Sequence, residues 1–138
     1  MMVSQKSHPT LGLGLIMKDE IEDLERIVDD YGAYFDKIYV AATRKKTYDS
    51  LLKSRIADNV ELSYFKWIDH FGKARLYNQK QIKTDYWMWI DLDDEIVGAE
   101  KIAGELEYMV KNNLDVIWFR YDYIPRETLS DPESLSWR

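Results

Sequence analysis

The sequence predicts an α/β domain, a three-layer α/β/α sandwich with a mostly parallel sheet. Short apolar stretches alternate with amphipathic helical stretches, which is the pattern of parallel strands joined by helical crossovers. The stretch from Tyr86 to Leu92 is almost continuously apolar, as expected for a central strand buried on both faces. A chain of 138 residues is long enough for one hydrophobic core. We therefore expect a polar leader at 1–10, one domain at 11–125 and a tail at 126–138.

Composition narrows the class of protein. Hydrophobic residues make up 46% and charged residues 32%, as in ordinary globular proteins. The net charge of −6, with no basic run longer than Arg44-Lys45-Lys46, argues against nucleic-acid binding. The lack of cysteine excludes disulfides and thiolate metal sites. No apolar run predicts a membrane span and residues 1–9 do not resemble a signal peptide, so the expected compartment is the cytoplasm.

The first predicted strand runs from Thr10 to Met17. It contains Gly12 and Gly14, but Met17 stands where a dinucleotide-binding fingerprint needs its third glycine, and the glycines lie inside the strand. We interpret the two glycines as marking either a close backbone approach or a bulge. Asp19, just after this strand, is suited to cap the following helix.

Apolar residues recur at helical spacing in four stretches, which predict helices near 20–31, 47–56, 69–84 and 99–112. The residues expected to face inward are Ile21, Leu24, Val28, Tyr31, Leu51, Leu52, Ile56, Phe71, Ala74, Tyr77 or Asn78, Ile82, Ile102, Leu106, Met109 and Val110.

Three further strands are predicted at 37–42, 60–67 and 116–124, the last ending at Pro125. With the first strand and the central one they give five strands in regular alternation with helices. The tryptophans in and near these strands, Trp87, Trp89 and Trp118, are expected to serve the core more than a ligand.

The central strand ends in a dense group of acidic residues. Asp91, Asp93, Asp94 and Glu95 place four carboxylates within five residues, and like charges this close repel one another. Mg²⁺ or Mn²⁺ would offset that repulsion, because hard cations take carboxylate oxygens and commonly bridge them to phosphates. Open parallel sheets bind ligands outside the carboxyl ends of their strands. The group therefore predicts a metal–phosphate site, and the alternative is a solvated acidic turn that ends a strand.

Several short motifs occur together in one order between Leu11 and Ile124. They are Lys18-Asp19-Glu20, Phe65-Lys66-Trp67, Asp69-His70-Phe71, Ala74-Arg75 and Asp91-Leu92-Asp93-Asp94. Each motif alone has little specificity, but the joint order resembles the nucleotide-binding half of a family 2 glycosyltransferase with the Rossmann-like GT-A fold.

The resemblance implies an inverting enzyme that transfers a sugar from a nucleotide sugar, UDP-linked by expectation, with Mn²⁺ or Mg²⁺. It implies that Asp93 holds the metal and that Asp91 lies near the ribose or the waters of the metal. Asp94 is a further candidate ligand. Asp94 and Glu95 could equally be exposed or lie behind the ligands.

The nucleotide-sugar site implied by the resemblance includes Lys18, Glu20, Thr43 and Arg75 as well as Asp91. Arg75 could pair with the diphosphate or with an aspartate of the acidic group, because its planar fork suits both, or it could be an ordinary surface residue. Residues 18–20 could serve only to cap a helix, and residues 43–44 could form a plain polar loop.

The sequence departs from the family pattern in three places. Leu76 follows Arg75 where the family has asparagine, and Val40-Ala41-Ala42 lacks the aspartate that commonly holds the nucleobase. The half that carries the acceptor site and the general base is expected to begin about where the sequence stops, at 136–138. No catalytic residue is assigned. The acidic tail residues Glu127, Asp131 and Glu133 are the available candidates for the base, and nothing in the sequence distinguishes one of them.

Two alternatives to an active transferase remain. The chain could be a truncated or degenerate GT-A domain that acts as a non-catalytic binding or structural module in a larger assembly. It could also be a receiver-like phosphate binder. That class expects acidic residues after the first strand, which Asp19-Glu20 partly provide, and a lysine after a late strand, which Tyr123-Ile124-Pro125 does not provide. His70 is expected to begin a helix and not to bind a metal.

Overall fold

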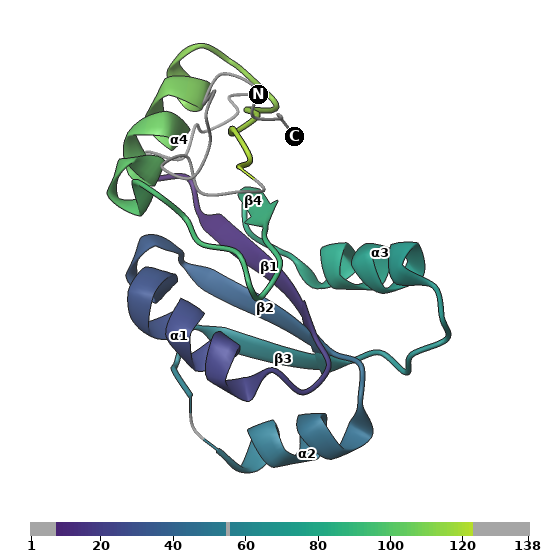
Figure 1. Ribbon diagram of the computed structural model, residues 1–138. Coiled ribbons are helices and arrows are strands. Elements are labelled where there is room, and N and C mark those ends of the chain that lie inside the picture. The colour runs from purple at the N-terminus through teal and green to yellow at the C-terminus, as the bar shows by residue number, and fades with distance from the viewer. Residues whose placement is uncertain (1–7, 55, 123–138) are drawn as a thin grey trace, which may run out of the picture. The chain divides into compact units, whose positions relative to one another are not determined.

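The computed structural model describes residues 8–54 and 56–122. They form an α/β protein in which strands alternate with helices along the chain (Figure 1). The chain divides into two compact units, Met1–Ala99 and Glu100–Arg138. The boundary falls inside segment 11–125, which the sequence predicts as one domain. Within the described residues, no helix has both the length and the apolar character needed to cross a membrane.

The first unit is built on four parallel strands. They are β1 (Leu11–Met17), β2 (Lys37–Ala42), β3 (Val60–Tyr64) and β4 (Tyr86–Trp89). Their order in the sheet is β3-β2-β1-β4, so the chain moves outward from β1 in one direction and then returns to its other side. The order reverses at the β1–β4 pair, which is the topological switch point at which Rossmann-like sheets bind ligands.

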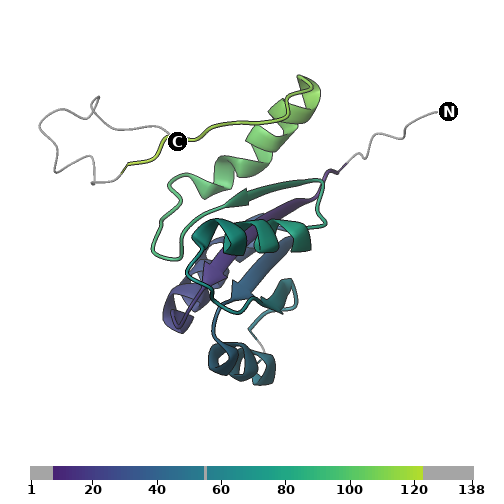
Figure 2. The ribbon, with the colours of Figure 1, turned by 90° about the vertical axis from the view of Figure 1, so that its right-hand side faces the viewer.

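Three α-helices connect these strands, namely α1 (Ile21–Tyr31), α2 (Lys45–Lys53) and α3 (Phe71–Gln81). A short 3₁₀ turn, η1 (Gly32–Tyr34), follows α1. The views in Figures 1 and 2 agree that α1 and α3 lie on opposite sides of the sheet. The predicted helix at 99–112 is present as a 3₁₀ turn, η2 (Ala99–Lys101), followed by α4 (Ile102–Lys111) of the second unit.

The core lies around β1 and β2. Leu13, Leu15, Ile38 and Val40 are fully buried in these strands, and the apolar face of α1 adds fully buried Leu24 and Ile27. Because these side chains are removed from water, they contribute to the hydrophobic stabilisation of the unit.

The opposite face of β1 carries its glycines. A Cβ atom on Gly14 would lie 2.6 Å from Asn78 Oδ1 and 3.3 Å from Ile82 Cδ1, so there is no room for a side chain there. The close approach at Gly14 is therefore made by side chains of α3 and of the residue after it, and not by backbone.

The predicted position of β4 is wrong within the described sheet, because β4 is an edge strand and not the central one. Trp87 and Trp89 are 37% and 45% exposed, and Trp118 of the second unit is 69% exposed, so none of them is a core residue. Trp87 pairs in register with Gly12 and Trp89 with Gly14. The two rings therefore share the face of α3, and the second edge of β4 has no strand beside it among the described residues.

The predicted fifth strand at 116–124 is wrong as far as the described residues reach. Residues 116–122 contain only an isolated bridge at Arg120, and residues 123–124 lie outside the described part. Apolar and polar residues alternate in this stretch, but an alternating sequence forms a strand only where a neighbouring strand supplies the backbone hydrogen bonds.

Two inward-facing predictions for helices are also wrong. Leu52 is 57% exposed, because α2 buries Thr47 and Leu51, four residues apart, and so turns position 52 outward. Phe71 is 54% exposed, because α3 buries Ala74 and Asn78 instead. In both helices the two buried residues are four positions apart. One of the two is polar in each helix, Thr47 in α2 and Asn78 in α3.

Candidate cation site at the carboxyl edge of the sheet

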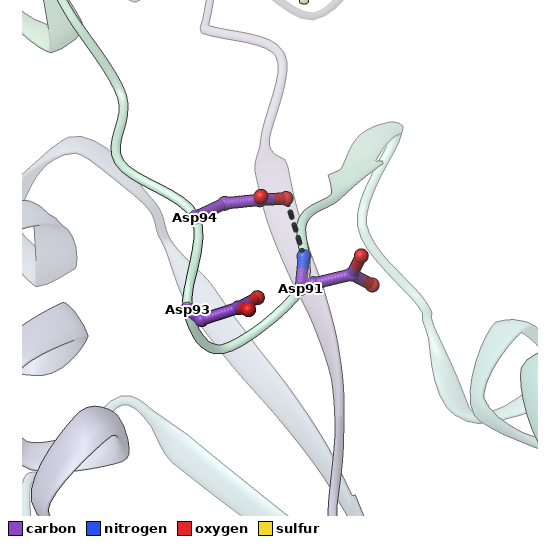
Figure 3. Close-up of side chains that lie close together, drawn as sticks. All are labelled: Asp91, Asp93 and Asp94. Carbon is purple, nitrogen blue, oxygen red and sulfur yellow. Dashed lines mark hydrogen bonds between the residues drawn. The ribbon is translucent and has the colours of Figure 1, made fainter. Parts of the chain in front are cut away.

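The acidic turn, Asp91–Asp94, follows β4 at the carboxyl edge of the sheet. Its backbone closes through a hydrogen bond of 3.0 Å from the Asp94 amide to the Asp91 carbonyl. The Asp94 carboxylate accepts a second bond of 2.9 Å from the Asp91 amide (Figure 3). Leu92, at the centre of the turn, is 6% exposed. A buried leucine and two hydrogen bonds thus fix a turn whose other side chains are acidic.

The three aspartates converge. One carboxylate oxygen from each of Asp91, Asp93 and Asp94 lies within 4.8 Å of the other two; Asp93 is exposed and its neighbours are half-buried. Oxygens bound to one Mg²⁺ lie about 2.1 Å from it and therefore no more than about 4.2 Å apart. The group consequently fits a small divalent cation after a slight closing movement, or with one carboxylate bound through a water molecule.

Helix α1 holds the acidic turn from behind. The Nη2 atom of Arg26 donates to the carbonyl of Leu92 at 2.8 Å and to the carbonyl of Asp94 at 3.0 Å. One turn further along α1, the hydroxyl of Tyr31 accepts from the amide of Ile96 at 3.0 Å. Neither Arg26 nor Tyr31 is predicted from the sequence to hold this turn. Their partners are backbone groups, which every residue has, so no sequence pattern indicates them.

Helix α3 contributes a second arginine. Arg75 Nη2 lies 3.5 Å from Asp91 Oδ1, with the side chains 14% and 45% exposed. The guanidinium carbon is 5.2 Å from the centre of the Phe71 ring and 5.4 Å from that of Trp89. Among the alternatives for Arg75, the structure shows the ion pair with an aspartate of the acidic turn, supported by two cation–π contacts.

The residues after β1 make their own contacts. Lys18 donates its amide to Glu20 Oε2 at 2.9 Å. The predicted role of Asp19 as a helix cap is wrong, because the N-cap of α1 is Glu20 and no side chain caps it. The Asp19 carboxylate instead accepts from Arg44 Nη1 at 2.8 Å and from Thr47 Oγ1 at 3.1 Å. The Arg44 guanidinium and the Thr47 hydroxyl therefore bind this carboxylate in place of the amides at the start of α1.

Thr43, predicted for the nucleotide site, is only 7% exposed. Its hydroxyl donates to the carbonyl of Met17 at 3.0 Å, and its amide donates to the same oxygen at 2.9 Å. Thr43 therefore joins the ends of β1 and β2. His70 begins α3 as predicted, since its Nδ1 accepts from the amide of Lys73 at 3.0 Å.

The structure thus brings together Asp91, Asp93, Asp94 and Arg75 of the predicted site. Lys18, Glu20 and Thr43 lie at the ends of the neighbouring strands β1 and β2, on the same edge of the parallel sheet. The tail residues considered for a general base, Glu127, Asp131 and Glu133, lie outside the described residues.

Fold and site together define a parallel α/β protein with a Rossmann-like strand order and a group of carboxylates at its switch point. Comparison of the sequence with protein-family models gives no match, and comparison with curated proteins gives none either.

Proposed function

We propose that this chain binds a nucleotide sugar, UDP-linked by expectation, through Mn²⁺ or Mg²⁺ held at the acidic turn. In this proposal it is the donor-binding part of a glycosyltransferase similar to family 2, with the three-layer GT-A fold. The observation that supports the proposal best is the convergence of Asp91, Asp93 and Asp94 beside the β1–β4 switch point. Helices on opposite sides of the sheet are consistent with the three layers.

Each aspartate has a different role in the proposal. Asp93 is the direct ligand, because it is the exposed member of the group. Asp94 accepts a hydrogen bond from the Asp91 amide and contributes one carboxylate oxygen to the converging group. Asp91 shares its carboxylate between the cation and Arg75. A bound divalent cation would supply neutralising charge for the leaving diphosphate.

Arg75 is proposed to contact the diphosphate. Its guanidinium already lies at the edge of the site, held between Asp91 and the rings of Phe71 and Trp89. A diphosphate presents oxygens that match the arginine fork better than one carboxylate oxygen at 3.5 Å does. Binding would therefore replace the contact with Asp91 by a paired contact with the diphosphate.

A specific observation favours the second candidate, a degenerate GT-A domain that binds without turnover. Ala41 and Ala42 are fully buried at the end of β2, and the hydroxyl of Thr43 is engaged by Met17. The end of β2 thus lacks the carboxylate expected for the nucleobase and offers no free hydroxyl in its place. Under this candidate the cation and diphosphate still bind, but the nucleobase contributes little to the affinity.

Thermal unfolding of the full chain tests the proposal. Because a ligand that binds only the native state stabilises it by mass action, Mn²⁺ with UDP should raise the Tm more than UDP alone. Asp93→Asn should remove this increment and leave the Tm of the unliganded protein unchanged or slightly higher. Asp29→Asn is the matched control, since Asp29 is an exposed aspartate on α1, outside the acidic turn.

The two candidates separate in the same experiment when pyrophosphate replaces UDP. If the nucleobase is recognised, Mn²⁺ with UDP should stabilise the chain clearly more than Mn²⁺ with pyrophosphate. Equal increments would favour the degenerate domain. An increment that survives Asp93→Asn would show that the acidic turn is not the cation site.

A further inference from the structure

Positive charge is concentrated in the connection between β3 and α3 and in α3 itself. Residues 66–83 contain five lysine or arginine side chains and one carboxylate, that of Asp69, within a chain whose net charge is −6. The rest of the chain is therefore strongly acidic. The arginine of the segment, Arg75, pairs with Asp91 of the acidic turn. The four lysines are exposed to solvent, and they are Lys66, Lys73, Lys80 and Lys83.

Three of these lysines belong to one surface of α3, the lysine face, defined as Lys73, Leu76, Lys80 and Lys83. Helix α3 turns its buried residues toward the sheet and exposes Lys73, Leu76 and Lys80, at i, i+3 and i+7, on the opposite side. Leu76 is 51% exposed. Lys83, just after the helix, donates from Nζ to the carbonyl of Lys80 at 3.3 Å, which keeps its charge close to the end of α3. The helix thus presents charge and an apolar side chain together to solvent.

The connection that leads into α3 exposes further apolar side chains. Trp67 is 41% exposed and Ile68 is 52% exposed. The Nε1 atom of Trp67 donates to Asp69 Oδ1 at 2.9 Å, so the one polar group of the indole is satisfied within the protein and its exposed surface is apolar. In Figure 1 the connection runs outward on the side of the sheet that carries α3. Single exposed apolar residues are ordinary, but these accompany a group of lysines.

An anionic membrane surface matches both features. Basic residues near such a surface are attracted to its anionic headgroups over a range of about one Debye length. Exposed tryptophan and aliphatic side chains enter the boundary between headgroups and acyl chains, while long lysine side chains keep their charges at the level of the headgroups. A nucleic acid would attract the same charges, but Ile68 and Leu76 cannot stack on its bases and would gain little from it.

We propose that the lysine face, together with Trp67 and Ile68, forms a peripheral docking surface for an anionic lipid bilayer. The proposal needs no membrane-spanning segment, since contact of this kind buries side chains only to the boundary of the headgroups. It does not require the acidic turn to bind a cation, so this proposal and the proposed function can fail separately.

Cosedimentation of the full chain with vesicles tests the proposal. The chain should bind vesicles that contain about one third phosphatidylserine and not vesicles of phosphatidylcholine alone, and binding should weaken as salt is added. The double variant Lys73→Gln with Lys80→Gln should lower the affinity for the anionic vesicles about 25-fold, since each lysine contributes about fivefold. The matched control, Lys46→Gln with Lys53→Gln, removes two exposed lysines of α2 and should lower the affinity clearly less.

The apolar contribution is tested at constant charge. Ile68→Gln with Leu76→Gln should weaken binding several-fold, because the affinity of an interfacial contact scales with its buried apolar area. Leu52→Gln, at an exposed leucine of α2, is the control and should have no effect. Tryptophan emission should shift to shorter wavelength when anionic vesicles are added, and Trp67→Phe should remove most of this shift. The replaced leucines and isoleucine are exposed, so these variants should keep the wild-type Tm without vesicles.

The possible outcomes are distinct. Binding that depends on phosphatidylserine and on Lys73 and Lys80, and much less on Lys46 and Lys53, supports the proposal. Absence of binding to anionic vesicles, or an equal loss in the two double-lysine variants, overturns it. Tighter binding to a single-stranded oligonucleotide than to anionic vesicles would identify a nucleic-acid surface and overturn it as well. None of these results decides whether Mn²⁺ and UDP bind, which Asp93→Asn tests.

Discussion

β2 and β4 are the two neighbours of β1, and they are built for different purposes. From Ile38 to Ala42, β2 is buried, and its end is closed by the two hydrogen bonds from Thr43 to Met17. β4 has alternate residues more than one third exposed and ends in a turn of converging aspartates. β2, on one side of β1, supplies stability, and β4, on the other side, presents charge at the surface.

The difference shows how a small domain can hold a repulsive group of charges. The acidic turn is supported by Leu92 in the interior and by arginines from two helices, Arg26 and Arg75. These arginines reduce the repulsion among the carboxylates and fix the direction of the turn. The stability of β2 does not depend on them, so changes in the two regions should have separable effects.

The largest expected effect is a loss of stability when β2 is truncated. Ile38 is fully buried, so Ile38→Ala should lower the free energy of unfolding by about 2–5 kcal/mol, the range observed for buried large-to-small changes. Met88→Ala in half-buried β4 should cost clearly less. Urea unfolding of both variants measures the difference. Equal costs would contradict the assignment of stability to β2.

A smaller effect is expected at the closed end of β2. Thr43→Val keeps the shape of the side chain and removes the hydroxyl that bonds Met17, which should cost about 1 kcal/mol of stability. Binding of Mn²⁺ alone should not change, because Thr43 belongs to the closed end. A drop in Mn²⁺ affinity, measured by titration, would show that the two ends are coupled.

The smallest effect on stability is expected in the acidic turn. Asp93→Asn removes an exposed carboxylate from a group of like charges, so stability should stay flat or rise slightly. The change should be larger at low ionic strength, where exposed charges are less screened. Urea unfolding at two salt concentrations measures it. Marked destabilisation would mean that Asp93 supports the fold.

The sequence predicted the elements well where they contribute to the core. The limits of β2 were predicted to the residue, and β1 and α1 nearly so, because burial imposes a clear period on their residues. The aspartates of the candidate site could also be predicted, since acidic residues after an apolar strand are visible in the sequence. Convergence of Asp91, Asp93 and Asp94 confirms that these residues could hold a cation, while its identity and the nucleotide stay predictions.

Other features had no signal in the sequence. The edge position of β4 depends on strand order, which an apolar run does not specify, and a run of aromatic residues is compatible with both positions. Asn78 is buried in α3 because it donates to the carbonyl of Tyr39, an interaction that no hydrophobic pattern predicts. The position of Asp19 after a strand predicts a helix cap, and its actual partners, Arg44 and Thr47, are too distant in sequence to be indicated by any local pattern.

The tryptophans of β4 give the molecule an optical property. The ring centres of Trp87 and Trp89 are 5.3 Å apart, with their planes inclined by 34°. At this spacing their electronic transitions couple, and the coupled pair should produce a split band in the circular dichroism spectrum. Trp89 is also in contact with Arg75, which pairs with Asp91. The chain therefore carries its own chromophore next to the acidic turn, and spectroscopy can follow changes at this turn without a label.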